Sequence, residues 1–327
     1  MGEVLPLQEG RSGPAVTDIR TRLEALGIFT FEDEPGIFGP ATRVAVEAFQ
    51  HRRGLRVDGI CGPQTWNTLV EAGFRIGDRT LSRRSPMLRG DDVAEVQQRL
   101  GALGFDSGRV DGIFGDLTAG AIAEFQRNSG LDADGIVGPT TLEELLRVRA
   151  HHTQSELVST VKAREQLRQA APTLAGRHVA VGQPGGLGPA VAALRRVLVP
   201  AGARVTSLQH PDGSAQARQA NAAGADVYLG LRLDPDALGC STSFFSGYRN
   251  ESPGGRRLAE LVQETVPKSL GIPNGGVHGM STPILRETRM PAVIVELGPA
   301  SVLVERAPSL AHWLTSALEA WAGSAWE

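Results

Sequence analysis

The sequence predicts a multi-domain fold: two small all-α domains of three helices each, followed by an α/β domain. Two observations predict this class. Residues 36–69 return in closely similar form at 112–145, at an offset of 76 residues. From His178 onward, short apolar runs alternate with amphipathic helical patterns, which is typical of an α/β domain. We expect a first repeat at 1–76, a second at 77–148, a linker helix at 149–175 and the α/β domain at 176–327.

Each repeat reads as a bundle of three short helices. In the second copy Val93, Val96, Leu100 and Leu103 recur at steps of three and four residues, which places them on one helical face. Gly104 then ends this helix, where a left-handed residue is favourable. The motif "DGIFGDLT" predicts a turn followed by an N-capping Asp or Thr. Upstream of this motif the copies match at an offset of 77, so one loop differs in length by a single residue.

The two copies resemble the peptidoglycan-binding domain type 1. The resemblance is carried by Phe49, Gln50, Asp58 and Gly59 in the first copy and by Phe125, Gln126, Asp134 and Gly135 in the second. Most matching positions are turn glycines, helix caps and core hydrophobes, which specify a fold better than a ligand. The resemblance implies muropeptides as ligands of the repeats.

The linker at 149–175 is rich in charged residues and predicts a partly exposed helix. His151 and His152 look like a pair of metal ligands at first sight. Adjacent residues on a helix do not face one another, so we interpret them as a solvated pair.

Alternating elements fill the second half of the chain. We expect strands at 178–182, 203–208, 226–233, 241–245 and 292–297, and helices at 189–200, 214–223, 254–267 and 308–322. The stretches "ARQANAAGADVYLGLRLD", "GGRRLAELVQETV" and "ILRETRMPAVIVELG" resemble the type 3 N-acetylmuramoyl-L-alanine amidases. Those enzymes hold zinc through a His in a turn, a Glu that opens the next helix and a His at a later strand end. A further Glu handles protons.

At these positions the sequence lacks the ligands that the resemblance implies. The turn His is replaced by Gly185 or, with the gap placed differently, by Pro184. No Glu occurs between residues 178 and 251, so the helix Glu is absent. Arg232 stands where the third ligand is expected, and a guanidinium only donates hydrogen bonds. The catalytic Glu survives as Glu296, which we expect to pair with Arg232 or another basic residue.

We therefore expect neither a catalytic residue nor a metal or other cofactor in this domain, and we interpret Glu296 as vestigial. A rebuilt zinc site would have to use His178, which precedes its strand, His210 in a turn and His278 in a glycine-rich loop. The residues most suited to contact a partner or line a groove are Arg218, Arg232, Asp234, Arg286 and Glu296.

The composition and the ends of the chain argue against several classes of function. The net charge of −3 and a pI near 6.2 give no electrostatic support for nucleic-acid binding. The first residues show no signal-peptide pattern, and no stretch approaches the ~18 apolar residues of a membrane span. The two cysteines, Cys61 and Cys240, lie far apart, which fits a reducing compartment. We expect a cytoplasmic protein.

The whole arrangement resembles a group of cytoplasmic actinobacterial homologues of these amidases. The resemblance implies a non-catalytic regulator that activates MurA, the UDP-N-acetylglucosamine enolpyruvyl transferase, by protein binding. It also implies a serine/threonine kinase, an FHA-domain protein and a lipid II flippase as partners, and a homodimer is plausible. The regulatory phosphothreonine of the group follows the last helix, whereas Thr315 and Ser316 lie inside a predicted helix and are poor candidates.

Two other functions stay open. One is a plain binding module for muropeptides or precursors, and the other is an active zinc amidase with relocated ligands.

Overall fold

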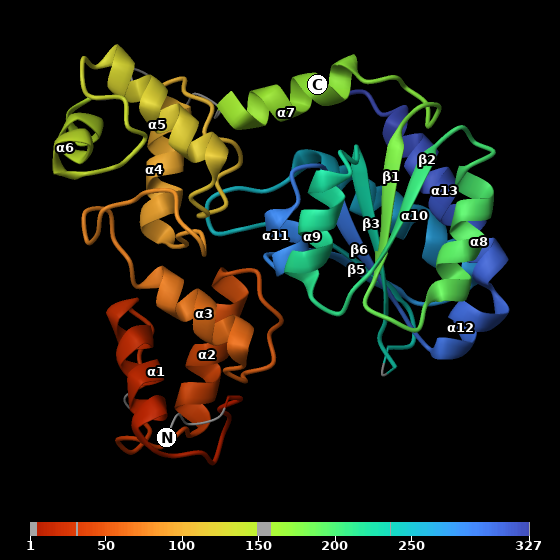
Figure 1. Cartoon of the computed structure of the whole chain (residues 1–327). Coiled ribbons are helices and arrows are strands. Elements are labelled where there is room, and N and C mark those ends of the chain that lie inside the picture. The colour runs from red at the N-terminus through yellow and green to blue at the C-terminus, as the bar shows by residue number, and fades with distance from the viewer. Residues whose placement is uncertain (1–4, 31, 149–157, 236, 327) are drawn as a thin grey trace. The chain divides into compact units, whose positions relative to one another are not determined.

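The structure is a computed structural model that describes residues 5–30, 32–148, 158–235 and 237–326. The chain divides into two compact units, residues 1–162 and 163–327 (Figure 1). Within the described residues, no helix is both long and apolar enough to cross a membrane.

The first unit contains the two helical repeats, as the sequence predicts. The helices of repeat 1 are α1 (Pro14–Ala25), α2 (Pro40–Arg52) and α3 (Pro63–Ala72), and those of repeat 2 are α4 (Asp91–Ala102), α5 (Asp116–Asn128) and α6 (Pro139–Arg147). Each repeat has its own apolar core. The cores are built around Phe38 and Phe49 in repeat 1 and around Phe114 and Phe125 in repeat 2, all at most 2% exposed.

The expected N-cap of α5 is wrong. The helix begins at Asp116, and the N-cap is Gly115 in an extended conformation. The hydroxyl of Thr118 is buried and accepts a hydrogen bond from Gln97 Nε2 at 3.1 Å. Thr118 therefore serves the packing between two segments of the repeat instead of capping the helix.

Helix α7 (Val158–Gln169) lies where a charged linker helix is expected. The pair His151 and His152 lies outside the described residues, so our interpretation of it stays a prediction.

The second unit is an α/β domain. Its elements are β1 (His178–Gln183), α8 (Gly188–Leu198), β2 (Arg204–Gln209), α9 (Gly213–Ala222), β3 (Val227–Leu233), β4 (Cys240–Phe245), α10 (Pro253–Leu270), β5 (Asn274–Met280), α11 (Pro283–Glu287), β6 (Ala292–Leu297), α12 (Ala300–Glu305) and α13 (Ala307–Ala322). In the described part of the chain the sheet has the order β2-β1-β3-β6-β4-β5. Strands β1, β2, β3 and β6 are parallel, whereas β4 runs antiparallel to β6 and β5 parallel to β4.

One expectation for this domain is wrong. His278 lies in strand β5 and not in a loop. The strand contains three glycines and shows no apolar alternation, so the sequence gives no strand signal there. Its ladder with β4 forms through the backbone and requires no such alternation.

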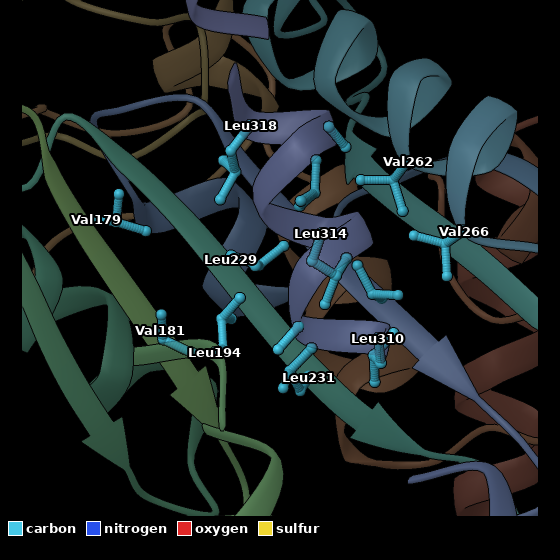
Figure 2. Packing of buried hydrophobic residues seen from close by; sticks show 14 of the residues in the cluster. Val179, Val181, Leu194, Leu229, Leu231, Val262, Val266, Leu310, Leu314 and Leu318 are labelled. Carbon is cyan, nitrogen blue, oxygen red and sulfur yellow. The ribbon is translucent and has the colours of Figure 1, made fainter. Parts of the chain in front are cut away.

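The main core of the domain lies between one face of the sheet and helices α8, α10 and α13. Figure 2 shows Val179 and Val181 of β1 and Leu229 and Leu231 of β3 on this face, with Leu314 of α13 among them. A smaller core on the other face contains Ala180 and Tyr228 from the sheet, with residues of α9 and α11. Because alternate residues of a strand face opposite sides, Arg232 and Glu296 lie on this second face.

Candidate functional site

The carboxyl ends of β1, β3 and β6 meet at one edge of the sheet, because these strands are parallel and neighbouring. This edge is where the amidase resemblance implies a metal site. The chain leaves β1 for α8 at this edge, and the crevice outside the carboxyl ends of the strands is where open α/β sheets bind ligands.

Arg232 and Glu296 form an ion pair at this edge. They are directly opposite one another in the register of β3 and β6. Arg232 Nη1 donates to Glu296 Oε1 at 3.1 Å, and the side chains are 46% and 27% exposed. The pairing that we expected from the sequence is therefore present, and it is accessible to solvent.

The turn after β1 is built from glycine and held by one amide side chain. Gly185 and Gly186 have φ angles of 152° and 79°, conformations that favour glycine. The buried Gln183 accepts from the backbone N–H of Leu187 at 2.8 Å and donates to Gln209 Oε1 at 3.1 Å. The turn thus places no metal-binding side chain at the first ligand position. The helix that follows, α8, contains neither Asp nor Glu.

Three of the four histidines of this unit, those that a rebuilt zinc site would use, lie far apart. His178 is the first residue of β1, about 16 Å along the strand from its carboxyl end. Its Nε2 is 2.7 Å from Thr206 Oγ1. His210 follows β2 and His278 lies on β5. These strands are the two edges of the sheet, about 24 Å apart. The three side chains therefore cannot share one metal ion.

The side chains at this edge can be compared with the ligands that a catalytic zinc ion needs. A catalytic zinc site needs three side-chain ligands and an open position for water. The edge offers a glycine turn and a carboxylate paired with a guanidinium, and among the residues that the structure describes no three His, Cys, Asp or Glu side chains come together as a metal site. The donor set does not fit zinc.

A polar network lies beneath this edge. Tyr228 on β3 donates to Gln216 Oε1 at 2.6 Å, and Gln216 Nε2 donates to the carbonyl of Gln183 at 3.1 Å. Burial raises the pKa of the Tyr228 phenol. Gly182 is required next to them, because a β-carbon there would collide with both side chains. Sequence reasoning did not find these residues, since the register that brings them together is a tertiary feature.

Arg218, Arg286 and Asp234 are the other residues that we expected to contact a partner or line a groove. Arg218 is exposed on α9, and Arg286 lies on α11, which packs against α9. The backbone N–H of Asp234 donates to Leu297 O, next to Glu296. The motif "AN..GAD" serves the fold, because Asn221 Nδ2 donates to the carbonyl of Glu287 at 2.8 Å.

In the repeats, the family signature forms a hydrogen-bond network. Gln126 Nε2 donates to Asp134 Oδ1, Ile136 O and Thr141 Oγ1 at 2.8, 3.0 and 3.0 Å. Its Oε1 accepts from Gly135 N–H at 2.9 Å. Gln50 makes the same bonds to Asp58, Gly59, Ile60 and Thr65 in repeat 1. Both glutamines are 1% exposed. The signature residues therefore hold the Asp-Gly turns.

Repeat 2 has one more Asp-Gly turn that is held by a buried glutamine, and repeat 1 has no equivalent of it. Gln97 Nε2 donates to Asp111 Oδ1, and its Oε1 accepts from Gly112 N–H. The equivalent residue in repeat 1 is Arg20, which donates to the carbonyls of Thr30 and Asp33. The two repeats therefore hold this loop with different side chains.

Comparison with known proteins identifies the family. The putative peptidoglycan binding domain matches residues 12–69 and 89–145, and the family described as N-acetylmuramoyl-L-alanine amidase matches residues 190–306. The N-acetylmuramoyl-L-alanine amidase CwlM of Mycobacterium tuberculosis is 35% identical, over 89% of this chain and 81% of that protein. The chain belongs to the N-acetylmuramoyl-L-alanine amidase family, as a homologue of CwlM.

Proteins named as amidases also match parts of this chain. CwlL of Bacillus licheniformis is 34% identical over 42% of this chain, which spans 44% of that protein's length. The crystal structure of the amidase Ami1 from Mycobacterium smegmatis covers 47% of this chain and 100% of its own, at 15% identity and a TM-score of 0.41.

Proposed function

We propose that this CwlM homologue acts by binding a partner and not by hydrolysis. The observation that carries the proposal is the ion pair of Arg232 and Glu296, at the place where an amidase would hold zinc. A guanidinium is always protonated and would repel a cation. Glu296 Oε1 accepts a hydrogen bond from this guanidinium at 3.1 Å, so the carboxylate is already engaged with a permanent positive charge. The relatives carry the name amidase, so the proposal separates this chain from their named activity.

The partner in this proposal is MurA, and the outcome is activation of peptidoglycan precursor synthesis in the cytoplasm. The membership of the family supports a role in peptidoglycan metabolism, and the resemblance described above supplies the partner. Control by a serine/threonine kinase and contacts with an FHA-domain protein and a lipid II flippase belong to the same proposal. Thr315 is buried in α13 and donates to Ala311 O, so it is not accessible to a kinase in the folded domain.

The test uses purified MurA from the same organism and the full chain. We expect the rate of enolpyruvyl transfer to rise at least threefold when this protein is added in slight excess. An unchanged MurA rate, with no complex detected by size-exclusion chromatography, overturns the proposal.

A second candidate is a muropeptide-binding module. The observation in its favour is the presence of two intact repeats that match the putative peptidoglycan binding domain. We expect saturable binding of a muropeptide to the full chain in calorimetry if this function holds. Binding without any effect on MurA would favour this candidate over the first.

A further inference from the structure

Strand β2 is the last strand at one side of the sheet, and among the described residues no strand lies beyond it. The N–H groups of Arg204 and His210 donate to backbone carbonyls of the β1 segment, at 2.8 and 3.2 Å. The backbone groups of successive residues alternate between the two edges of a strand. The N–H and C=O groups that point away from β1 are therefore those of Val205, Ser207 and Gln209. We call these outward groups the β2 edge.

The β2 edge is regular along its whole length. Its strand pairs with β1 in unbroken register, contains neither Pro nor Gly and carries its one charged residue at the first position. Edge strands are commonly protected by a proline, a bulge or a lysine within the strand, and β2 has none of these. Strand β5 at the other side of the sheet contains three glycines, and its register with β4 shifts between Cys240 and Ser241. The β2 edge is thus the better template for a further strand.

The charge around the β2 edge is positive. Residues 178–211 contain three arginines and neither Asp nor Glu. Arg204 begins β2, and Arg195 and Arg196 are exposed on α8, which packs against β1 and β2 (Figure 1). In the part of the chain that the structure describes, none of the three forms an ion pair. An acidic side chain that approaches this edge would therefore meet positive charge that no carboxylate of the protein neutralises.

We propose that the β2 edge receives an extended acidic segment of a partner protein, which adds a strand to the sheet. The backbone groups decide the conformation of the occupant, because only an extended chain presents complementary N–H and C=O groups at the same spacing. The arginines decide its side chains, since they favour Asp and Glu. A second copy of β2 would bring Arg204 and no acidic residue, so charge does not favour pairing of the strand with itself.

This inference goes beyond the proposed function, because it names a surface and the chemistry of its occupant and holds whether or not the partner is MurA. The test measures binding of an acidic, strand-forming probe to the full chain. The probe is a fluorescein-labelled peptide of alternating Val and Glu with the length of β2. By fluorescence anisotropy at about 50 mM salt we expect a Kd below about 1 mM.

Salt and peptide charge should both change this affinity. Because the attraction is partly between exposed charges, the Kd should rise severalfold at about 500 mM salt. The same peptide with Lys in place of Glu should bind at least about tenfold more weakly, since it meets like charge.

Amide hydrogen exchange locates the bound peptide. In the free protein the N–H groups of Thr206 and Leu208 face β1 and should be protected, whereas the outward N–H groups should exchange rapidly. Saturating peptide should slow exchange at Val205, Ser207 and Gln209 at least about tenfold and leave the inner two amides unchanged. Binding that leaves the outward amides unprotected would overturn the inference.

Two variants with matched controls test the edge and the charge separately. Ser207→Pro removes an outward donor and keeps the ladder to β1, because proline is tolerated where the N–H faces solvent. It should weaken binding at least about tenfold, whereas Ser207→Ala should stay within about twofold of the parent.

The second variant is Arg195→Gln with Arg196→Gln, which should weaken binding at least about threefold. Arg75→Gln with Arg84→Gln makes the same change of net charge at exposed positions of the other unit, and its Kd should not change. This pair of variants decides the result if Ser207→Pro does not fold.

Any of three results overturns the inference: no binding at 2 mM peptide, a folded Ser207→Pro that binds as well as Ser207→Ala, or a lysine peptide that binds as well as the acidic one. A homodimer that is lost in Ser207→Pro also overturns it, because a second copy then occupies the β2 edge. None of these results depends on the MurA assay. If MurA is stimulated equally by the parent and Ser207→Pro, the proposed function stands and MurA does not use this edge.

Discussion

Replacement of Gln126 by Ala should destabilise repeat 2 strongly. The substitution removes four hydrogen bonds from a side chain that is 1% exposed. At ~1 kcal/mol of net stability for each bond, the loss is about 4 kcal/mol. This loss comes from polar groups left without partners inside the repeat.

All four tryptophans of the chain lie outside repeat 2, so tryptophan fluorescence would not report its unfolding. Amide hydrogen exchange is therefore the assay. The N–H of Val137 donates to Leu81 O at 2.8 Å and reports opening of the repeat. A loss of about 4 kcal/mol corresponds to roughly a thousandfold faster exchange of this amide.

Asn128→Ala is the matched control, since Asn128 is exposed and makes one bond, to Glu124 O. It should change stability by less than ~0.5 kcal/mol. If Gln126→Ala speeds exchange at Val137 less than tenfold, the network does not hold the Asp-Gly turn and the structural reading of the signature is wrong.

Three further predictions follow from the described contacts. A double-mutant cycle with Arg232→Ala and Glu296→Ala should give a coupling of about 0.2–1 kcal/mol in urea unfolding, because the pair is exposed; a coupling above ~3 kcal/mol would contradict this. Burial raises the pKa of the Cys61 thiol to about 12 and that of Cys240 to about 11. A disulfide reagent at pH 8 should therefore label neither thiol within minutes unless the protein is unfolded, and rapid labelling of either would show that it is accessible. Hydrogen bonds from the Ile136 N–H and from Gln126 lower the pKa of Asp134. This group stabilises the fold above its unfolded pKa near 3.8 and ceases to do so as the pH falls through its lower folded value; Asp134→Asn should therefore make unfolding less sensitive to pH below 4, and an unchanged acid profile would count against this role.

The sequence was sufficient for the fold class. The repeats are specified by glycine turns and core hydrophobes at matching positions, and these features have local sequence signals. The apolar run of β3 predicts the strand, and the amidase resemblance places Arg232 and Glu296 at its site, which is why their pairing could be expected. The boundaries of the main strands and helices agree with the structure to within one to three residues.

The sequence was insufficient where contacts between distant polar residues decide the structure. The network of Tyr228, Gln216 and Gln183 depends on the register of β1 and β3 and has no local signal. Strand β5 was not found, because its glycines hide it. The exchange of Gln97 for Arg20 between the repeats could have been noticed at the offset of 77. The different hydrogen bonds that the two residues make could be known only from the structure of the loops.

The most direct test of the central claim is the zinc content of the purified full chain. The protein would be incubated with excess zinc, freed of loosely held ion and measured by inductively coupled plasma mass spectrometry. Since the edge with Arg232 and Glu296 does not fit the metal, we expect well below one zinc per chain. One tightly held zinc per chain, together with a release of stem peptide from muropeptides that is lost in Glu296→Ala, would contradict the account and make this protein an active amidase.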